Sequence, residues 1–146
     1  MTNIQIMAVG SAKAADRRRP RIRLAGLWLA EIGFTADSLV TASYDRGSIN
    51  LKLQGQGMET YSRLISQIRK DKSGLIQVRS LLHNKKRTPH LEVKGFWLER
   101  FGFTIGGVIA VRQEYGFIQI RLLDLSKLEF GYPEAPGQRG SPLYIE

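Results

Sequence analysis

Two runs of basic side chains are the part of this sequence best suited to chemistry with an anion. Clustered lysine and arginine side chains neutralise backbone phosphates and gain affinity by releasing the counterions that those phosphates hold. A single run is also typical of a solvated loop, but two runs at matching places in the chain favour a binding surface. The candidate nucleic-acid-binding residues are Arg17, Arg18, Arg19, Arg21 and Arg23 in the first run, and Lys85, Lys86 and Arg87 in the second.

The two histidines of the chain flank the second basic run. Imidazole beside a phosphate can act as a general acid or base, which is one route to the cleavage of RNA. His83 and His90 are therefore the candidate catalytic residues, and the alternative is that both are ordinary loop residues. The first run has no histidine at the corresponding place, so such catalysis is expected in one half of the chain only.

Composition excludes several other chemistries. The chain has no cysteine, so it contains neither disulfides nor thiolate metal sites, and two histidines cannot form a zinc site without carboxylate ligands. No glycine-rich loop resembles a phosphate cradle, so we expect no cofactor and no metal. The apolar runs are too short to span a membrane, and the first residues lack the blocks of a signal peptide. We therefore expect no membrane partner and a cytoplasmic location.

Net charge indicates the class of partner. The 146 residues carry 22 Lys+Arg against 13 Asp+Glu, which gives a formal net charge of +9. An excess of this size favours nucleic acid as the partner, with an anionic membrane surface and simple solubility as the alternatives. Residues 124–146 differ from the rest of the chain because they are acidic overall and rich in glycine and proline.

An internal duplication determines where the basic runs lie. Sliding the chain along itself until Pro20 meets Pro89 aligns 20–55 with 89–124 without a gap, and ten of the first 34 positions are then identical. Average composition predicts a match at about one position in sixteen, so the repeat is real. Further upstream, IQI at 4–6 matches IQV at 76–78 only if three residues are dropped. The identical pairs are Pro20/Pro89, Gly26/Gly95, Trp28/Trp97, Leu29/Leu98, Gly33/Gly102, Phe34/Phe103, Thr35/Thr104, Gly47/Gly116, Ile49/Ile118 and Leu53/Leu122.

Each half of the chain predicts the same order of elements. A strand, the basic loop and a second strand are followed by a short helix that ends at Gly33 or Gly102. A third strand, a tight turn and a strictly alternating fourth strand complete the half. The expected strands are 3–8, 21–25, 38–44 and 48–53 in the first half, and 75–80, 90–94, 107–113 and 117–122 in the second.

The two halves are expected to share one core. A unit of about 50 residues buries little surface alone, so a pseudo-dimer within one chain is the natural arrangement, and a further homodimer is an open alternative. Trp28, Trp97, Phe34 and Phe103 are expected in the core, whereas Tyr115 and Phe117 are candidates for base stacking. The expected divisions are a first repeat at 1–54, a connector helix at 55–73, a second repeat at 74–125 and a Pro/Gly-containing tail at 126–146.

The shared motif resembles the SymE family of SOS-induced type I toxins. The matching residues, over about two-thirds of the chain, are Pro20, Gly26, Trp28, Leu29, Gly33 and Phe34, and again Pro89, Gly95, Trp97, Leu98, Gly102 and Phe103. The family is related to AbrB and MazE, so the resemblance implies a mainly β fold, a swapped-hairpin β-barrel built here within one chain. It also implies a toxin that acts on RNA with endoribonuclease activity, while the AbrB-like fold points equally towards DNA.

Three functions are therefore open. The first is a SymE-type toxin that binds and acts on RNA. The second is a non-catalytic AbrB-like DNA-binding regulator or nucleoid protein, which the lack of a convincing catalytic set favours. The third is an antitoxin-like module that binds a protein partner through the acidic tail.

Overall fold

The computed structural model describes residues 3–71, 74–83 and 85–123. Strands predominate in this part of the chain, which confirms the mainly β class, and each half contains one short helix as expected. The elements are β1 (Asn3–Ala8), β2 (Gly10–Ala14), β3 (Arg17–Ala25), α1 (Leu27–Glu31), β4 (Leu39–Asp45), β5 (Ser48–Gly55), α2 (Gly57–Asp71), β6 (Gly74–Gln77), β7 (Arg79–His83), β8 (Lys86–Lys94), η1 (Phe96–Phe101), β9 (Val108–Glu114) and β10 (Phe117–Leu122).

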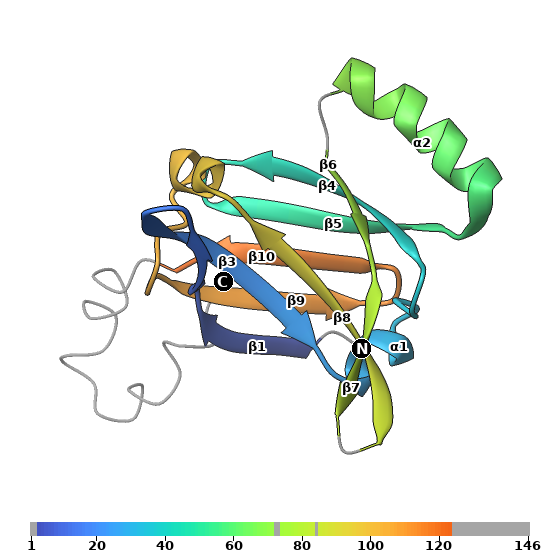
Figure 1. Cartoon of the computed structure of the whole chain (residues 1–146), viewed down its shortest axis with the longest axis horizontal. Helices are drawn as coiled ribbons and strands as arrows, with labels where there is room; N and C mark the ends of the chain where they lie inside the picture. Colours follow the sequence, from blue (N-terminus) through green and yellow to red (C-terminus); the bar gives the residue numbers. More distant parts are fainter. Residues whose placement is uncertain (1–2, 72–73, 84, 124–146) are drawn as a thin grey trace, which may run out of the picture.

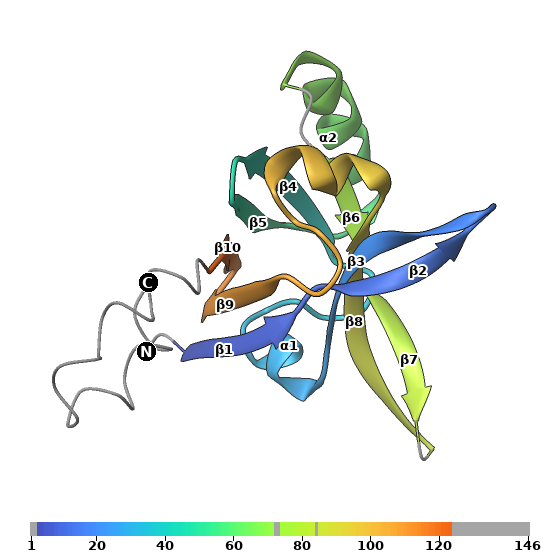
Figure 2. The same cartoon turned by 90° about the vertical axis from the view of Figure 1, so that its left-hand side faces the viewer.

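The strands form two antiparallel sheets. The larger sheet has the order β1-β9-β10-β5-β4-β6, and the smaller has the order β2-β3-β8-β7. The smaller sheet lies in front of the larger one in Figure 1, and Figure 2 shows its two hairpins, β2–β3 and β7–β8, projecting on the same side of the molecule. We call these hairpins the first arm (residues 10–25) and the second arm (residues 79–94).

Both sheets contain strands of both halves, and the two halves pair with each other in each sheet. The pairs β1–β9, β10–β5, β4–β6 and β3–β8 all join one half to the other. Arg23 lies opposite Glu92 in the β3–β8 pair, and Asn50 lies opposite Gln119 in the β5–β10 pair. Each of these residues thus faces its own equivalent in the other half, so a pseudo-two-fold axis passes through both pairs.

The duplication is continuous through the first strands of each half. The amide of Val9 donates to the Gly107 carbonyl at 2.8 Å, and the amide of Val78 donates to the Ser38 carbonyl at 2.9 Å. Val9 and Val78 are equivalent in the gapless alignment of the two halves, and so are their acceptors. The three-residue gap expected upstream is therefore wrong, because the IQI similarity is out of register with the backbone.

The expected closed barrel is not formed in the part of the chain described. Both sheets are open, and β1, β6, β2 and β7 are their edge strands. The reason is that the chain changes sheets at Val9 and Val78, where β2 and β7 leave the larger sheet and pair outward with β3 and β8. The strand expected over 75–80 is divided at this crossing into β6 and β7.

One core lies between the sheets and contains residues of both halves. Phe34 and Phe103 are fully buried there, as are Leu29 and Leu98 of the short helices. The alternating residues of β5 and β10 point inward as their period of two predicts. Ile49, Leu51, Ile118 and Ile120 are buried, and Leu53 and Leu122 are partly buried. Trp28 and Trp97 pack against this core, and their indole N–H groups donate to the carbonyls of Ala25 and Lys94 at 3.1 and 3.2 Å, respectively. The expected core positions are confirmed.

The connector helix is present as α2. It contacts β6 and stands out from the body of the molecule in Figure 1, with Leu64 as its one fully buried residue among those described. Within the same described segments, no helix combines the length and apolar character that crossing a membrane requires.

Candidate nucleic-acid interface

The basic runs lie on strands of the two arms, so their interpretation as loops is wrong. The arginines of the first run belong to β3, while Lys86 and Arg87 begin β8. The outer part of each strand extends outward paired with β2 or β7, from Arg21 to Arg17 and from His90 to Lys86. Lys85 is at the tip of the second arm, where its φ of 64° closes the turn.

Strand alternation divides the arginines of the first run between two faces. Ile22 and Leu24 are buried and point to the core, so Arg21 and Arg23 point to the opposite, outward face of the smaller sheet. β8 follows the same pattern, with Leu91 and Val93 directed inward. His90, Glu92 and Lys94 therefore share the outward face with Arg21 and Arg23.

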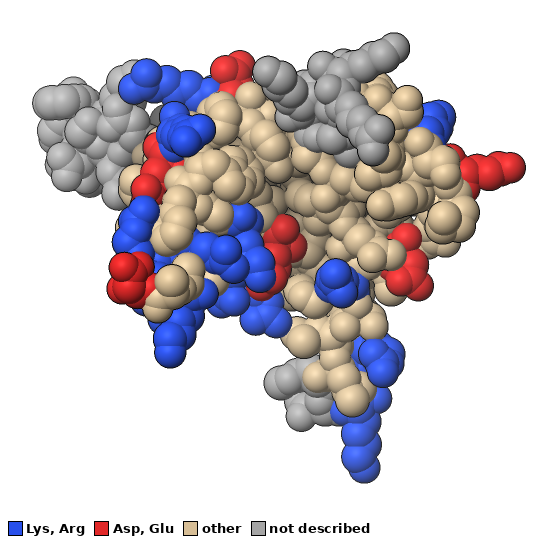
Figure 3. Space-filling model, turned by 45° about the horizontal axis from the view of Figure 1, so that its top comes forward, with Lys and Arg blue, Asp and Glu red and all other residues tan. Residues whose placement is uncertain are grey.

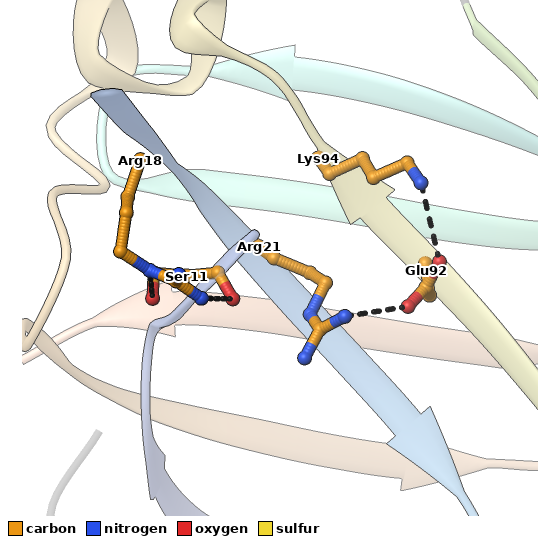
Figure 4. A network of polar contacts seen from close by, with 5 residues as sticks. All are labelled: Ser11, Arg18, Arg21, Glu92 and Lys94. Carbon is orange, nitrogen blue, oxygen red and sulfur yellow. Dashed lines mark hydrogen bonds and ion pairs between the residues drawn. The ribbon is translucent and has the colours of Figure 1, made fainter. Parts of the chain in front are cut away.

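The centre of the outward face contains one carboxylate between two cations (Figure 4). Arg21 Nη1 lies 3.4 Å from Glu92 Oε2, and Lys94 Nζ lies 3.7 Å from Glu92 Oε1. Arg21 and Glu92 are partly buried and Lys94 is exposed, and the two ion pairs hold these side chains next to the pseudo-two-fold axis. With Arg23 included, this centre has three cations and one anion and therefore a net positive charge.

Each arm also holds one exposed arginine against a serine of its partner strand. Arg18 Nε donates to Ser11 Oγ at 2.6 Å, and Arg87 Nη1 donates to Ser80 Oγ at 3.0 Å. Arg18 additionally donates from Nη2 to the Ser11 carbonyl, and Figure 4 shows this contact. These two arginines are equivalent in the duplication, so the pseudo-symmetry places a preoriented guanidinium at the same point on both arms.

Two arginines of the first run have other surroundings. The guanidinium of Arg17 lies 3.7 Å from the centre of the Phe96 ring and pairs with Glu99 at 3.7 Å, so η1 anchors it. Arg19 has a buried Nε with no hydrogen-bond partner among the described residues. The first run is therefore not a uniform cationic patch, because Arg17, like Arg21, is already paired with a carboxylate of the protein.

The expected single basic face is present only where the arms meet. Arg21 of the first arm lies opposite Lys94 of the second in the β3–β8 ladder, but the tips of the arms diverge (Figure 2). Figure 3 shows lysine and arginine gathered over both arms, with a largely uncharged surface over the rest of that view. Lys94 and Arg79 belong to this surface and were missed in the sequence, although strand alternation places Lys94 on the same side as His90.

The two candidate catalytic histidines are on the second arm but do not form a pair. In the β7–β8 ladder His90 lies opposite Arg79 and His83 lies opposite Lys86, four rungs further out, which is about 13 Å along a strand. The Nδ1 atom of His90 is buried and has no partner among the described residues, whereas the side chain of His83 lies outside the part described. Within the described residues, no group of three His, Cys, Asp or Glu side chains could hold a metal ion.

The candidate stacking residues lie away from the arms. Tyr115 is 77% exposed at the β9–β10 turn, and Phe117 begins β10 in the larger sheet. Phe117 lines a separate hollow of about 450 Å³ with Lys52 and Asn50. Neither ring is therefore part of the outward face of the smaller sheet.

Comparison with protein-family models, with curated proteins and with solved structures finds no match to this chain. Inference about function therefore starts from the charge and geometry of the two arms.

Proposed function

We propose that this protein binds nucleic acid through the outward face of the smaller sheet and the two arms. The observation that carries the proposal is the matched pair Arg18 and Arg87, each held by a serine on an exposed hairpin and related by the pseudo-two-fold axis. Guanidinium groups fixed in this way lose less conformational freedom when they contact a phosphate. Arg21, Arg23 and Lys94 add positive charge between the arms on the outward face of the smaller sheet, whereas Arg18 and Arg87 lie on the other face of their strands.

RNA is the target that we propose first, in a toxin of the SymE type with endoribonuclease activity. The support for this target is the sequence resemblance. The pairing of strands across the two halves adds a feature that a swapped-hairpin, AbrB-like arrangement also requires. His90 is the described histidine nearest the cationic centre, two residues from Glu92 on the same strand face. It is therefore our first candidate for an acid or base in RNA cleavage.

A DNA-binding regulator without catalysis is the second candidate function. Two observations favour it, namely the pseudo-two-fold relation of the arms, which suits a duplex with two-fold symmetry, and the separation of the two histidines. The antitoxin-like alternative depends on residues 126–146, which lie outside the described residues.

The deciding experiment measures binding and strand integrity together. Labelled single-stranded RNA and duplex DNA are titrated with the protein over a series of salt concentrations. The test variant is Lys85→Ala/Lys86→Ala/Arg87→Ala, and we expect it to reduce the slope of log affinity against log salt by about three on duplex DNA and about two on single-stranded RNA. Cleavage of RNA that disappears in a His90→Ala variant would support the toxin, and intact strands with tight duplex binding would support the regulator.

A charge-matched control separates a specific interface from net charge. Arg46, Arg63 and Arg121 are exposed and lie on the β4–β5 turn, on α2 and on β10, outside the two arms. Replacing all three with alanine removes the same charge as the test variant, and we expect little change in the salt slope. Equal losses in the control and the test variant would contradict the proposal.

A further inference from the structure

A small cavity opens on the second arm, between β8 and the edge strand β6. Its volume is about 240 Å³, which is less than the 300–1,000 Å³ of a typical drug-sized site, so it suits a small group. It lies where the chain passes from the larger sheet to the smaller one. The residues that line it and matter for its chemistry are Leu75, Gln77, Arg79, His90, Glu92 and Lys94.

The lining combines apolar surface with both kinds of hydrogen-bonding group. Leu75 provides apolar wall, while Arg79 and Lys94 offer donors only. Glu92 offers acceptors, and an amide such as that of Gln77 offers both donors and acceptors. A phosphate accepts only and would meet a carboxylate here, so the mixed lining suits a flat ring with donors and acceptors on its edge.

Two polar groups in this lining have unused capacity. His90 Nδ1 is buried without a hydrogen-bond partner among the described residues, a condition that native proteins relieve with a water or a ligand. The carboxylate of Glu92 is held by Arg21 and Lys94 (Figure 4), and each of its oxygens retains a second lone pair. Both groups are therefore positioned before any ligand arrives.

The first half of the chain lacks these groups. At the equivalent positions of that half, Ala8 replaces Gln77, Gly10 replaces Arg79 and Arg21 replaces His90. Arg23 and Ala25 likewise replace Glu92 and Lys94. The backbone is repeated but this lining is not, so the residues of the cavity are not a by-product of the duplicated fold.

We propose that the cavity binds one unpaired nucleobase of a single-stranded nucleic acid that the arms hold by its phosphates. The ring lies against Leu75, and its edge bonds with Gln77, His90 and Glu92. Arg79 and Lys94, at the same cavity, contact the flanking phosphates. Recognition of splayed-out bases by apolar contact and edge hydrogen bonds is the usual way in which proteins read single strands. This inference rests on the proposed binding of nucleic acid and adds a base-reading site to it.

The test is a scan of the bound strand with the full-length protein. A short labelled single-stranded oligonucleotide is compared with versions in which each nucleotide in turn lacks its base. We expect one position at which base removal weakens binding about tenfold, as loss of a well-held base does elsewhere. In Gln77→Ala/His90→Ala this position-specific loss should disappear, because the intact strand then binds as weakly as the abasic one.

The matched control is Lys85→Ala on the tip of the same arm. It should weaken binding of the intact and abasic strands by the same factor and so leave their ratio unchanged. Thermal unfolding of Gln77→Ala/His90→Ala checks that the arm is folded, and the scan of the unmodified protein needs no variant at all.

The outcomes distinguish this inference from the proposed function. Salt-sensitive binding with no position-specific loss would overturn the base site and leave the interface intact. Absence of binding to any strand would overturn both. A nucleoside monophosphate that shifts the His90 imidazole NMR signals, combined with a flat abasic scan, would assign the cavity to a free nucleotide and also overturn the proposal.

Discussion

The two arms have the same backbone but different anchorage. On the first arm, Arg17 stacks on Phe96 and pairs with Glu99 of η1. On the second arm Lys86 has the place of Arg17, and at α1 the exposed Leu27 and Ala30 replace the aromatic ring and the carboxylate. A duplicated hairpin has thus become one arm fixed by the body and one whose tip has no such bracing among the described residues.

The larger sheet contains a second difference between the halves. Tyr44 packs edge-on against Trp97, with ring centres 4.5 Å apart, and also contacts Phe101. A Cβ atom on Gly74 would lie 2.7 Å from the Tyr44 hydroxyl, so the glycine makes room for the ring. In the other half Gln113 and Gln5 have the equivalent places and share a hydrogen bond of 3.2 Å. The two halves thus use different pairs at equivalent positions, namely Tyr44 with Gly74 and Gln113 with Gln5.

The residues on the pseudo-two-fold axis show what duplication allows. A homodimer of one half would place each axial residue opposite its own copy, so an arginine would face an arginine. Here Arg23 faces Glu92, and Gln119 donates to Asn50 Oδ1 at 3.2 Å. Joining the halves in one chain permits unlike residues across the axis, and the base cavity is an asymmetric feature of the same origin.

The largest expected effect tests whether the halves share one core. Phe34 and Phe103 are both fully buried at equivalent positions, so either Phe→Ala change should cost about 3–5 kcal/mol of unfolding free energy. The two losses should be similar, and urea unfolding should remain a single transition in both variants. Two separate transitions, or a loss confined to one variant, would show that the halves are stabilised independently.

The next effect tests whether the Gly74 and Tyr44 pair of one half can be replaced by the two glutamines found in the other. Gly74→Gln places a side chain where Tyr44 packs, and overpacking of this kind costs about 1–3 kcal/mol. Adding Tyr44→Gln recreates the amide pair of the other half and should recover most of that loss. A double-mutant cycle by urea unfolding measures this coupling, which should be favourable. Strict additivity of the two changes would mean that the halves do not differ by a coupled exchange.

Alkaline pH should lower the stability of the whole fold through Tyr44, which only one half contains. Burial raises the pKa of Tyr44 from 10.0 to about 12, so the folded state holds the phenolic proton more tightly than the unfolded state. The stabilisation is present below pH 10 and is lost as the pH rises from about 10 to about 12, with a limit of about 2 kcal/mol because the ring is partly exposed. Tyr44→Phe should remove this part of the pH dependence in thermal unfolding curves. An unchanged alkaline profile would place its origin elsewhere.

Much of the fold could be predicted because each strand and helix can be inferred independently from both copies of the repeat. The alternation in SINLKL and FIQIRL identifies β5 and β10, and Gly33 and Gly102 end the short helices with φ of 96° and 94°. The open sheets could not be predicted, because no residue type marks the crossings at Val9 and Val78. These crossings arise because β2 pairs with β3 and β7 pairs with β8, so both strands leave the larger sheet.

The candidate site was predictable in its residues but not in its shape. The basic runs are correctly identified as clusters, but the prediction of loops is wrong for their arginines, although RPRIRL already alternates around Ile22 and Leu24. The cavity beside His90 depends on β6 and β8, which are adjacent only because β7 and β8 form an arm. Arg79 and Lys94 could be assigned to the site only from the alternation of side chains along their strands.

The smallest expected effect compares Arg17, which is held against η1, with the equivalent Lys86, which is free to contact a phosphate. Arg17→Ala removes a contact with an aromatic ring and an exposed ion pair, so it should cost about 0.5–1 kcal/mol of stability. Lys86→Ala removes an exposed side chain and should change stability by less than about 0.5 kcal/mol. In binding to nucleic acid the order should reverse, because Glu99 already compensates Arg17 whereas Lys86 has its full charge available for a phosphate. Thermal unfolding and salt-dependent titration of the same two variants test both orders. Equal behaviour in both measurements would mean that the bracing by η1 has no functional consequence.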